Sequence, residues 1–313
     1  MHLIDLHCDT LYKAVTQNIS FSDKALECQL IDKRTNSHKL QCYAIWIPDK
    51  LNGDEADELF LKAYNKLLNE CYDNEITLID KFKDTAKSFS KYANTAFFTI
   101  ENGLAINKKL ESIEKFAKLG VKMITLTWND HNCIGGGADT NNTLGLTEFG
   151  RKAVAEMERH KIIIDISHAS DRLFYDVSEI TSRPFMASHS NSRSITNHRR
   201  NLTDEQFKII CDRGGIVGIN FHNAFLNNVP DNACMDDILR HTEHFLSLGG
   251  ENSIAIGSDF DGCVLAKNIN GTASIDKICD MFSKNGYNDD LIQKIFYKNA
   301  LNFFENFDNQ RIM

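Results

Sequence analysis

The sequence has only three prolines, and it lacks any long uninterrupted apolar segment. A membrane-spanning helix needs about 20 consecutive apolar residues, so none is predicted. No Pro-rich or Ser-rich linker, low-complexity tract or repeat of fixed period divides the chain. We therefore expect residues 1–313 to form a single domain, a length that α/β barrels commonly reach.

The nine cysteines include no pair at CxxC spacing, and their number is odd. This argues against a structural zinc site of the usual Cys type, and a disulfide framework is not expected in so long a chain. The chain also lacks a basic start followed by an apolar segment of about 7–15 residues, so no signal peptide is predicted. We expect reduced thiols and a cytoplasmic protein.

Positive charge is not concentrated anywhere, and the formal net charge is −8. Nucleic-acid binding requires a basic footprint, and anionic membranes likewise attract clusters of Lys and Arg. We therefore expect neither nucleic acid nor a membrane surface as a partner. A homodimer is left open, because barrel enzymes often dimerise and the sequence points to no interface.

Eight short apolar segments recur along the chain. Several are continuous apolar runs, which are typical of strands buried on both faces of a parallel sheet. The predicted strands are Leu3–Leu6, Cys42–Ile47, Ala96–Ile100, Val121–Thr127, Ile162–Ile166, Pro184–Ala187, Gly215–Asn220 and Ile254–Gly257.

Amphipathic segments lie between most of these strands. The predicted helices are Glu55–Asn74, Ile76–Tyr92, Ile106–Leu119, Glu148–His160, Asp171–Ile180, a segment that begins after the capping box at 203–206, Asp237–Leu248 and Asp289–Phe304. Gly120, Gly214 and Gly249 stand where helix C-caps are expected. Residues 10–40 are expected to be a long loop carrying short helices. The alternation predicts an α/β fold of the (β/α)₈ TIM barrel type, although an open doubly wound sheet gives a similar pattern.

Residues able to bind a metal follow the predicted strands at their C-terminal ends. They are His7 and Asp9 after the first strand, Glu101 after the third, His168 after the fifth, His189 after the sixth and Asp259 after the eighth. Barrel active sites are assembled at this end from several strands. Closing the sheet would bring these side chains toward one axis, which favours a metal-dependent hydrolase.

Each carboxylate and the first histidine also have an ordinary structural explanation. His7 and Asp9 can reach one metal because alternate strand residues face the same side, but a lone HxD motif is weak. Glu101 would be costly to bury unpaired, yet it could simply face water. Asp259 lies in a Gly-Ser-Asp-Phe-Asp-Gly segment, whose residue types are also common in turns.

The two later histidines are harder to explain as structural. His168 and His189 occupy equivalent strand ends, and neutral imidazole is the commonest metal ligand. Asp165 is a candidate to orient them, as metal-bound histidines usually require. His131 and His222 fall in predicted loops at the same end, and we keep both as candidate substrate contacts.

These residues form part of an ordered series of motifs. The series is Asp5-Leu6-His7-Cys8-Asp9-Thr10, Ile100-Glu101, Thr125-Leu126-Thr127-Trp128-Asn129, Asp165-Ile166-Ser167-His168, Ser188-His189-Ser190, Arg199-Arg200-Asn201-Leu202, Gly257-Ser258-Asp259-Phe260-Asp261-Gly262 and Asn299-Ala300-Leu301. It resembles the membrane (renal) dipeptidase family of zinc dipeptidases, including its bacterial cytoplasmic members. Each motif alone is weak, whereas the ordered set is highly specific and spans residues 3 to about 304.

The resemblance implies a (β/α)₈ barrel with two Zn²⁺ ions, although sites of this kind accept other divalent ions. By resemblance, His7 and Asp9 bind the first ion, and His168 and His189 bind the second. Glu101 would bridge the two.

The resemblance also implies the reaction, which is hydrolysis of a small dipeptide by a hydroxide that bridges the metals. Asp259 would be the catalytic acid/base, and Arg200 would contact the substrate. Three positions depart from the pattern: Asn102 replaces a frequent Gly, Trp128 replaces a His of the animal enzymes, and His222 replaces a Tyr. His131 is a candidate to substitute for the missing histidine, so substrate preference stays open.

Two alternatives use the same fold. One is a binuclear-metal amidohydrolase acting on a lactam or an N-acyl amino acid, and the fold cannot choose between the substrates. The lack of an obvious lysine in the fourth strand, which many such relatives use as a modified bridge, favours the dipeptidase. The other is a non-catalytic binding protein, which should have lost a ligand, whereas every ligand position is filled.

Overall fold

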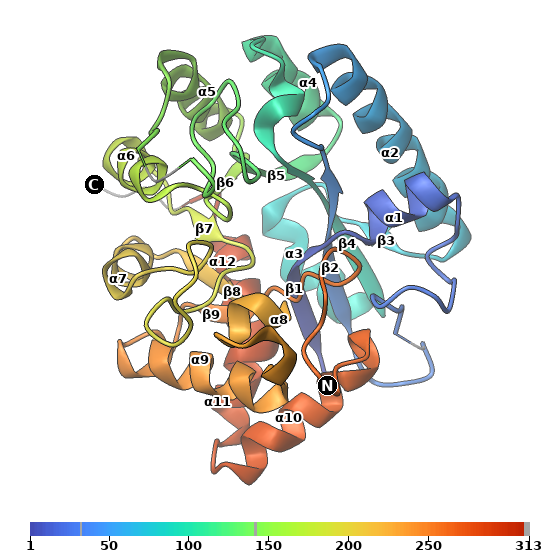
Figure 1. Ribbon diagram of the computed structural model, residues 1–313. Coiled ribbons are helices and arrows are strands. Elements are labelled where there is room, and N and C mark those ends of the chain that lie inside the picture. The colour runs from blue at the N-terminus through green and yellow to red at the C-terminus, as the bar shows by residue number, and fades with distance from the viewer. Residues whose placement is uncertain (32, 141–142, 310–313) are drawn as a thin grey trace.

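The computed structural model describes residues 1–31, 33–140 and 143–309. The strands of these residues form one parallel sheet in the order β2-β1-β9-β8-β7-β6-β5-β4-β3, and β2 also pairs with β4. Eight of the strands therefore close into a barrel with helices around it (Figure 1). The strands are β1 Leu3–Cys8, β2 Lys39–Trp46, β3 Thr77–Leu78, β4 Asn94–Glu101, β5 Val121–Thr125, β6 Ile163–Asp165, β7 Met186–Ala187, β8 Ile216–Ile219 and β9 Ile254–Ile256. The predicted (β/α)₈ barrel is confirmed.

The ninth strand, β3, lies where a helix was expected. It pairs with Thr95 and Ala96 of β4, below the point at which β5 joins β4 at Phe98. The predicted helix Ile76–Tyr92 is therefore wrong as one element. The segment contains β3, a 3₁₀ turn at Phe82–Asp84 and a short α-helix.

The helices surround the barrel wall (Figure 1). They are α1 Thr10–Gln17, α2 Gly53–Asp73, α3 Thr85–Lys91, α4 Leu110–Lys118, α5 Glu148–Arg159, α6 Asp171–Ile180, α7 Asp204–Asp212, α8 Asn223–Leu226, α9 Met235–Ser247, α10 Ile275–Lys284, α11 Asp289–Gln293 and α12 Asn299–Asn306. The expected C-cap glycines are confirmed, since Gly120, Gly214 and Gly249 have φ values of 87°, 69° and 91°. Of these helices, α8 and α10 were not predicted.

The barrel interior is apolar at its N-terminal end. One hydrophobic cluster receives side chains from each of the eight barrel strands, including Phe97, Met123 and Met186. Phe303 and Phe304 of α12 belong to the same cluster and close the barrel from below. A filled interior of this kind leaves the opposite, C-terminal end for a binding site.

Backbones approach one another closely at the C-terminal ends of β7, β8 and β9. A Cβ atom at Gly218 of β8 or at Gly257 after β9 would collide with the carbonyl oxygen of Ser188. Glycine is required where another backbone comes this near. These positions let the segment after β7, which carries His189, lie tightly against its neighbours.

No helix among the described residues is long and apolar enough to cross a membrane.

Candidate metal centre and substrate cavity

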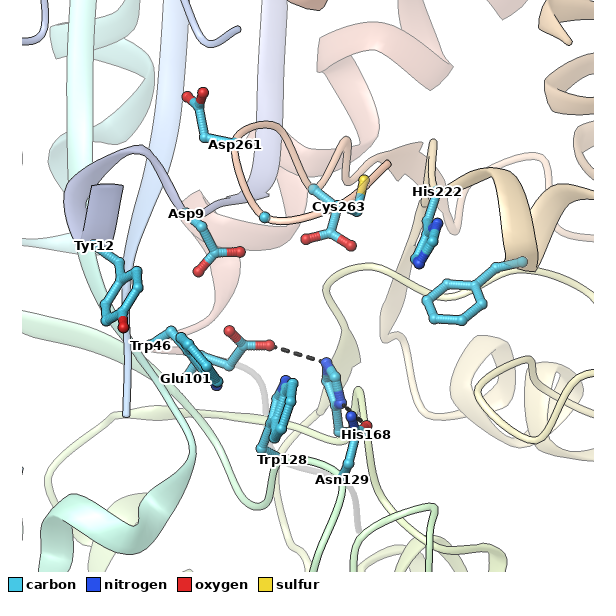
Figure 2. A pocket seen from close by; sticks show the side chains of 13 residues that line it. Asp9, Tyr12, Trp46, Glu101, Trp128, Asn129, His168, His222, Asp261 and Cys263 are labelled. Carbon is cyan, nitrogen blue, oxygen red and sulfur yellow. Dashed lines mark hydrogen bonds and ion pairs between the residues drawn. The ribbon is translucent and has the colours of Figure 1, made fainter. Parts of the chain in front are cut away.

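The predicted ligands meet at the C-terminal end of the barrel, although they come from strands far apart in sequence. None of them is more than 8% exposed, and they line or adjoin one cavity (Figure 2). They are His7 in β1, Asp9 directly after it, Glu101 at the end of β4, His168 after β6, His189 after β7 and Asp259 after β9.

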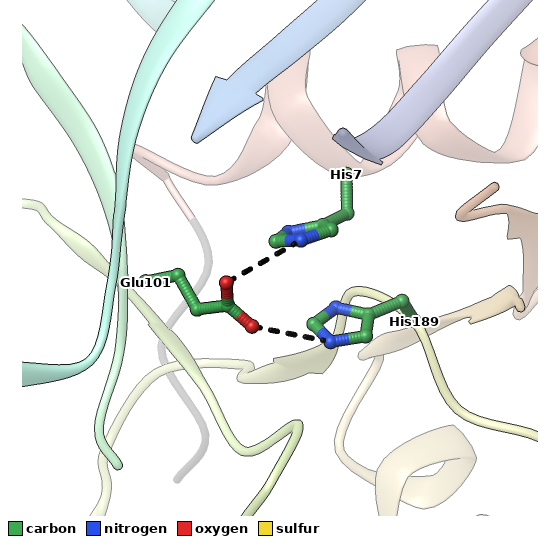
Figure 3. Close-up of side chains that lie close together, drawn as sticks. All are labelled: His7, Glu101 and His189. Atoms are coloured by element: carbon green, nitrogen blue, oxygen red, sulfur yellow. Dashed lines mark ion pairs between the residues drawn. The ribbon is translucent and has the colours of Figure 1, made fainter. Parts of the chain in front are cut away.

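Glu101 lies between three imidazole rings. Its Oε1 is 3.0 Å from Nε2 of His168 and 3.6 Å from Nε2 of His189. Its Oε2 is 3.8 Å from Nε2 of His7, so the two carboxylate oxygens face opposite histidines (Figure 3). A carboxylate that presents one oxygen to each side has the arrangement needed to bridge two cations.

The second group of donors surrounds His7. Its Nε2 is 3.4 Å from Oδ2 of Asp9 and 3.7 Å from Oδ1 of Asp259. Donor atoms of His7, Asp9 and Asp259 lie within 4.8 Å of one another, as do those of His7, Glu101 and His189. Two overlapping clusters of His and carboxylate donors therefore share His7.

Several donor atoms in this centre lack a hydrogen-bond partner among the described residues. They include both ring nitrogens of His7, Oδ1 of Asp9 and Nε2 of His189, all of them buried. A buried polar atom left unsatisfied is costly, and each of these atoms is a metal-ligand type. The residues present therefore fit divalent cations.

The pKa shifts of these side chains also fit a site for divalent cations. Burial, followed by the charge of Asp9, raises the pKa of Glu101 well above its usual value. Burial lowers the pKa of His168 and of His189 well below 6.5, which leaves both imidazoles neutral and able to ligate. Burial lowers the pKa of His7, but the carboxylates of Glu101, Asp9 and Asp259 outweigh it and raise the pKa to about 10. A cation would replace the protons that this crowded site otherwise retains.

Outer hydrogen bonds fix the ligand rings. The Nδ1 of His189 lies 2.7 Å from Oγ of Ser188, and that hydroxyl donates to Oδ2 of Asp165 at 2.6 Å. The Nδ1 of His168 lies 2.9 Å from the amide oxygen of Asn129. In each ring the Nδ1 hydrogen is thereby assigned to the outer partner, and the Nε2 lone pair faces the centre. The supporting position expected for Asp165 is the one observed.

Two site residues have a left-handed backbone, which is uncommon outside glycine. The φ angle is 68° at His168 and 65° at Asp259. Such conformations concentrate at functional sites, where the surrounding structure enforces them. Burial, with the nearby charge of Asp9 adding to it, raises the pKa of Asp259 to about 7, a value suited to proton transfer.

Arg200 is buried beside this centre. It is only 6% exposed, and its Nε and Nη2 lack a hydrogen-bond partner among the described residues. The guanidinium carbon lies 5.3 Å from the ring centroid of Phe225, and burial lowers the pKa of Arg200 to about 10. A buried guanidinium with two unpaired nitrogens, next to a residue that lines the cavity, is suited to a carboxylate ligand.

The two remaining histidines have different positions. His222 lines the cavity at the N-terminus of α8 (Figure 2). His131 does not: its side chain is 68% exposed, its Nδ1 lies 3.0 Å from Oδ1 of Asp130, and it lines a separate surface hollow. The structure therefore does not bring His131 to the site, because the loop after β5 turns its side chain toward solvent.

Several cavity residues were not anticipated from the sequence. They are Tyr12, Trp46, Phe225 and Cys263, which line a cavity of about 240 Å³ together with the predicted residues (Figure 2). Only Tyr12 and Trp46 carried a usable signal, since Tyr12 follows Asp9 by three residues and Trp46 is the next-to-last residue of a predicted strand. Phe225 lies in the short helix α8, which was not predicted, and Cys263 lies in a loop whose course the sequence does not reveal.

Comparison with known proteins agrees with this geometry. The model of the family described as membrane dipeptidase (peptidase family M19) matches residues 1–311. The chain belongs to the membrane dipeptidase family. It is thus an enzyme of a metallopeptidase family.

Two individual relatives share about 30% sequence identity with this chain over their matched residues. An uncharacterized protein in the pqqA 5′ region of Klebsiella pneumoniae is 30% identical over 216 residues, which cover 66% of this chain and 80% of that protein. The uncharacterized dipeptidase C965.12 of Schizosaccharomyces pombe is 29% identical over 222 residues, but these cover 68% of this chain and only 52% of that protein.

Solved structures show the same fold. The crystal structure of a metallopeptidase described as dipeptidase AC has a TM-score of 0.91 at 24% identity, and the match covers 98% of both chains. A metallopeptidase from Rhodobacter sphaeroides, crystallised with a phosphinate mimic of the dipeptide L-Ala-D-Ala, also has a TM-score of 0.91, at 23% identity, covering 98% of this chain and 99% of that one.

The departure at position 102 from the family pattern has a structural basis. Asn102 has a φ of 79°, a region that glycine adopts freely and that asparagine tolerates better than most residues. Its amide nitrogen donates to the carbonyl of Ile47 and to Oδ1 of Asp49, at 2.8 and 2.7 Å. The asparagine therefore adopts a backbone conformation that glycine reaches freely, and it adds two hydrogen bonds beside Glu101.

Proposed function

We propose that this protein is a zinc-dependent dipeptidase with two metal ions. The observation that carries the proposal is the centre itself, in which buried His and carboxylate donors with unsatisfied atoms converge beside an unpaired arginine. His7 and Asp9 would hold one Zn²⁺, His168 and His189 the other, and Glu101 would bridge them. When bound, the two cations would lower the pKa of a shared water toward neutrality and polarise the scissile carbonyl.

The chain's own residues would supply the remaining steps. Asp259 would accept a proton from the attacking water and pass it to the leaving amine, as its pKa near 7 allows. Asn220 donates to Oδ2 of Asp259 at 3.0 Å, which leaves Oδ1 on the side of His7. Arg200 would hold the C-terminal carboxylate of the substrate with its two free nitrogens.

The size of the cavity agrees with a small substrate. Its volume of about 240 Å³ is slightly below the usual range of ligand pockets, which starts at about 300 Å³. The Rhodobacter sphaeroides neighbour was crystallised with a mimic of L-Ala-D-Ala, so both L,L- and L,D-dipeptides belong in a first substrate panel. A cytoplasmic location, the lack of nucleic-acid and membrane partners, and a homodimer remain predictions.

The amidohydrolase alternative is less well supported. The predicted fourth strand, β5, does contain one lysine, Lys122, but it lies near the start of that strand and its Nζ is 3.8 Å from Oδ1 of Asp80 rather than at the centre. A modified lysine bridge is therefore not available there. An N-acyl amino acid also has a carboxylate for Arg200, so the test must include both substrate classes.

The decisive experiment combines metal analysis with a substrate panel. We expect about two metal ions per chain, hydrolysis of L,L- or L,D-dipeptides, loss of that activity on chelation, and recovery with Zn²⁺. N-acetyl amino acids and lactams should react far more slowly. Full activity in a preparation stripped of divalent ions would refute the metal-dependent mechanism, and faster hydrolysis of N-acyl amino acids would favour the amidohydrolase.

A further inference from the structure

The substrate cavity has one side built from aromatic rings. Tyr12 from α1, Trp46 from the end of β2 and Trp128 from the segment after β5 lie along it; we call these three residues the aromatic wall (Figure 2). The ring centroids of Tyr12 and Trp46 are 4.9 Å apart, as are those of Trp46 and Trp128. The wall is thus a continuous surface of three rings.

The wall is fixed next to the reacting centre. Trp46 pairs in register with Glu101, and the ring of Trp128 is 5.9 Å from the ring of His168. Each of the three wall side chains is only partly buried, so apolar ring surface remains uncovered inside the cavity. The Nε1 of Trp46 is buried without a hydrogen-bond partner among the described residues. Uncovered rings beside an unused donor indicate a place that a ligand occupies.

The opposite side of the cavity differs in chemistry. His222 lies on this side (Figure 2), Phe225 also lines the cavity, and Arg200 lies over the ring of Phe225. If the substrate carboxylate binds Arg200 and the scissile bond lies at Glu101, the first residue of a dipeptide must extend toward the aromatic wall. This step rests on the proposed function.

We propose that the aromatic wall receives the side chain of the first residue and makes the enzyme prefer dipeptides that begin with a large apolar residue. Covering such a side chain with ring surface removes apolar area from water on both partners. Glycine at the first position would leave the rings exposed to water. An acidic side chain there would lose its hydration close to the carboxylates of Asp9 and Glu101, which is unfavourable. Selectivity at the second position should depend on the wall much less.

Two dipeptide series test the proposal through kcat/KM. Gly-Ala, Leu-Ala and Phe-Ala vary the first residue, while Ala-Gly, Ala-Leu and Ala-Phe vary the second. In the native enzyme we expect Phe-Ala to exceed Gly-Ala by about tenfold or more, as burial of one large side chain implies. Trp128→Ala should reduce that ratio about tenfold, with Trp128→His as a second variant in case the alanine protein does not fold.

The matched control is Tyr72→Ala, which removes an aromatic ring that is 86% exposed on α2 and does not line the cavity. It should leave both series unchanged. An equal loss for all dipeptides in Trp128→Ala, or a change confined to the second-residue series, would overturn the proposal. The first result would mean that the wall binds the common ammonium group, and the second that the dipeptide lies in the reverse direction.

Fluorescence separates this inference from the proposed function. The chain has two tryptophans, and both belong to the wall. In metal-loaded Asp259→Asn protein, Leu-Ala should shift the tryptophan emission to shorter wavelength more than Ala-Leu does. Calorimetric binding of Leu-Ala without that shift would refute the wall. Failure of the native enzyme to hydrolyse any dipeptide would refute the proposed function instead, whatever the emission shows.

Discussion

Arg200 is unusual for a buried side chain, because no carboxylate among the described residues forms a hydrogen bond with its guanidinium. Its free nitrogens predict that the enzyme depends on the carboxylate of its substrate. Hydrogen bonds to a charged group contribute about 1.5–3 kcal/mol, so Arg200→Met should lower kcat/KM about 10- to 100-fold. The same loss should appear when the native enzyme is given a dipeptide amide, whereas the variant should treat acid and amide alike.

Asp259 gives a second prediction at this scale. Asp259→Asn removes the carboxylate that would move the proton but keeps the hydrogen bond from Asn220 within reach. We expect a fall in kcat of about 10²- to 10⁴-fold with unchanged metal content. Metal analysis of the same sample is the control. A variant that works at the native rate would show that another group transfers the proton.

The individual site residues differ in how far the sequence could predict them. His7, Glu101, His168 and His189 follow strands, so the ends of those strands fixed their positions. Asp165 could be predicted equally well from the sequence, since it lies at the end of a strand. His131 could not be placed, because the direction of its side chain is set by a loop hydrogen bond to Asp130. The contacts of Trp46 with Tyr12 and Trp128 join three distant elements, and no local pattern reports them.

At the scale of elements, paired strands hold the ligands through a clamp between Asp and Ser. Asp165 in β6 accepts from the backbone nitrogen and the hydroxyl of Ser188 after β7, and Asp5 in β1 accepts in the same way from Ser258 after β9. Each clamp therefore joins two neighbouring strands next to the proposed metal centre.

Ser188→Ala should weaken metal binding, because the hydroxyl is the link between Asp165 and the ring of His189. Loss of such an outer partner typically costs 10- to 100-fold in metal affinity, an approximate range that a competing chelator can resolve. Ser247→Ala is the matched control, since that exposed hydroxyl on α9 donates to the carbonyl of His244 and lies in a different part of the fold. Equal affinities in the two variants would contradict the role of the clamp.

Helix α9 carries a buried histidine, His241, whose contribution to stability should depend on pH. His241 is buried, accepts a hydrogen bond from the backbone of Ser192 at Nδ1 and lies 3.0 Å from the carbonyl of Leu226 at Nε2. This pattern requires the neutral ring, and burial lowers the pKa of His241 to about 4. The unfolded chain, with a histidine pKa near 6.5, therefore binds the proton more readily than the folded chain between these values.

The free energy of unfolding should consequently fall as the pH drops through this window. From pH 7 to pH 5, His241 alone should account for a loss of about 2 kcal/mol. Denaturant unfolding of the native protein and of His241→Gln at both pH values measures it. The variant should be less stable at pH 7 but should lose less on acidification. Parallel pH profiles for the two proteins would rule out this assignment.

The elements also show where local patterns stop being sufficient. All eight barrel strands could be predicted, because each contains a short apolar segment and several are continuous apolar runs, as is typical of strands buried on both faces. The segment from Ile76 was mistaken for a helix since Ile79, Phe82 and Phe89 have spacings that a helix tolerates. Its first residues become β3 because β4 begins before β5 and leaves backbone groups of Thr95 and Ala96 to be paired. That demand arises only once the barrel has closed.

On the scale of the whole molecule, the proposed metal centre is assembled from residues in or directly after β1, β4, β6, β7 and β9, so the charge of the site and the stability of the fold are linked. Without cations, the carboxylates of Asp9, Glu101 and Asp259 face one another in a buried volume. Chelation should therefore lower the melting temperature, and at a free Zn²⁺ concentration of about 100 Kd each filled site should add about 2.7 kcal/mol to the free energy of unfolding. Residues from all eight strands share one interior cluster with α12, which predicts that unfolding remains a single transition as the metal is removed. Calorimetry across a Zn²⁺ titration measures both quantities. A melting temperature that does not change with Zn²⁺ concentration would argue against a metal site in the barrel. Two separate transitions would contradict the prediction of a single domain.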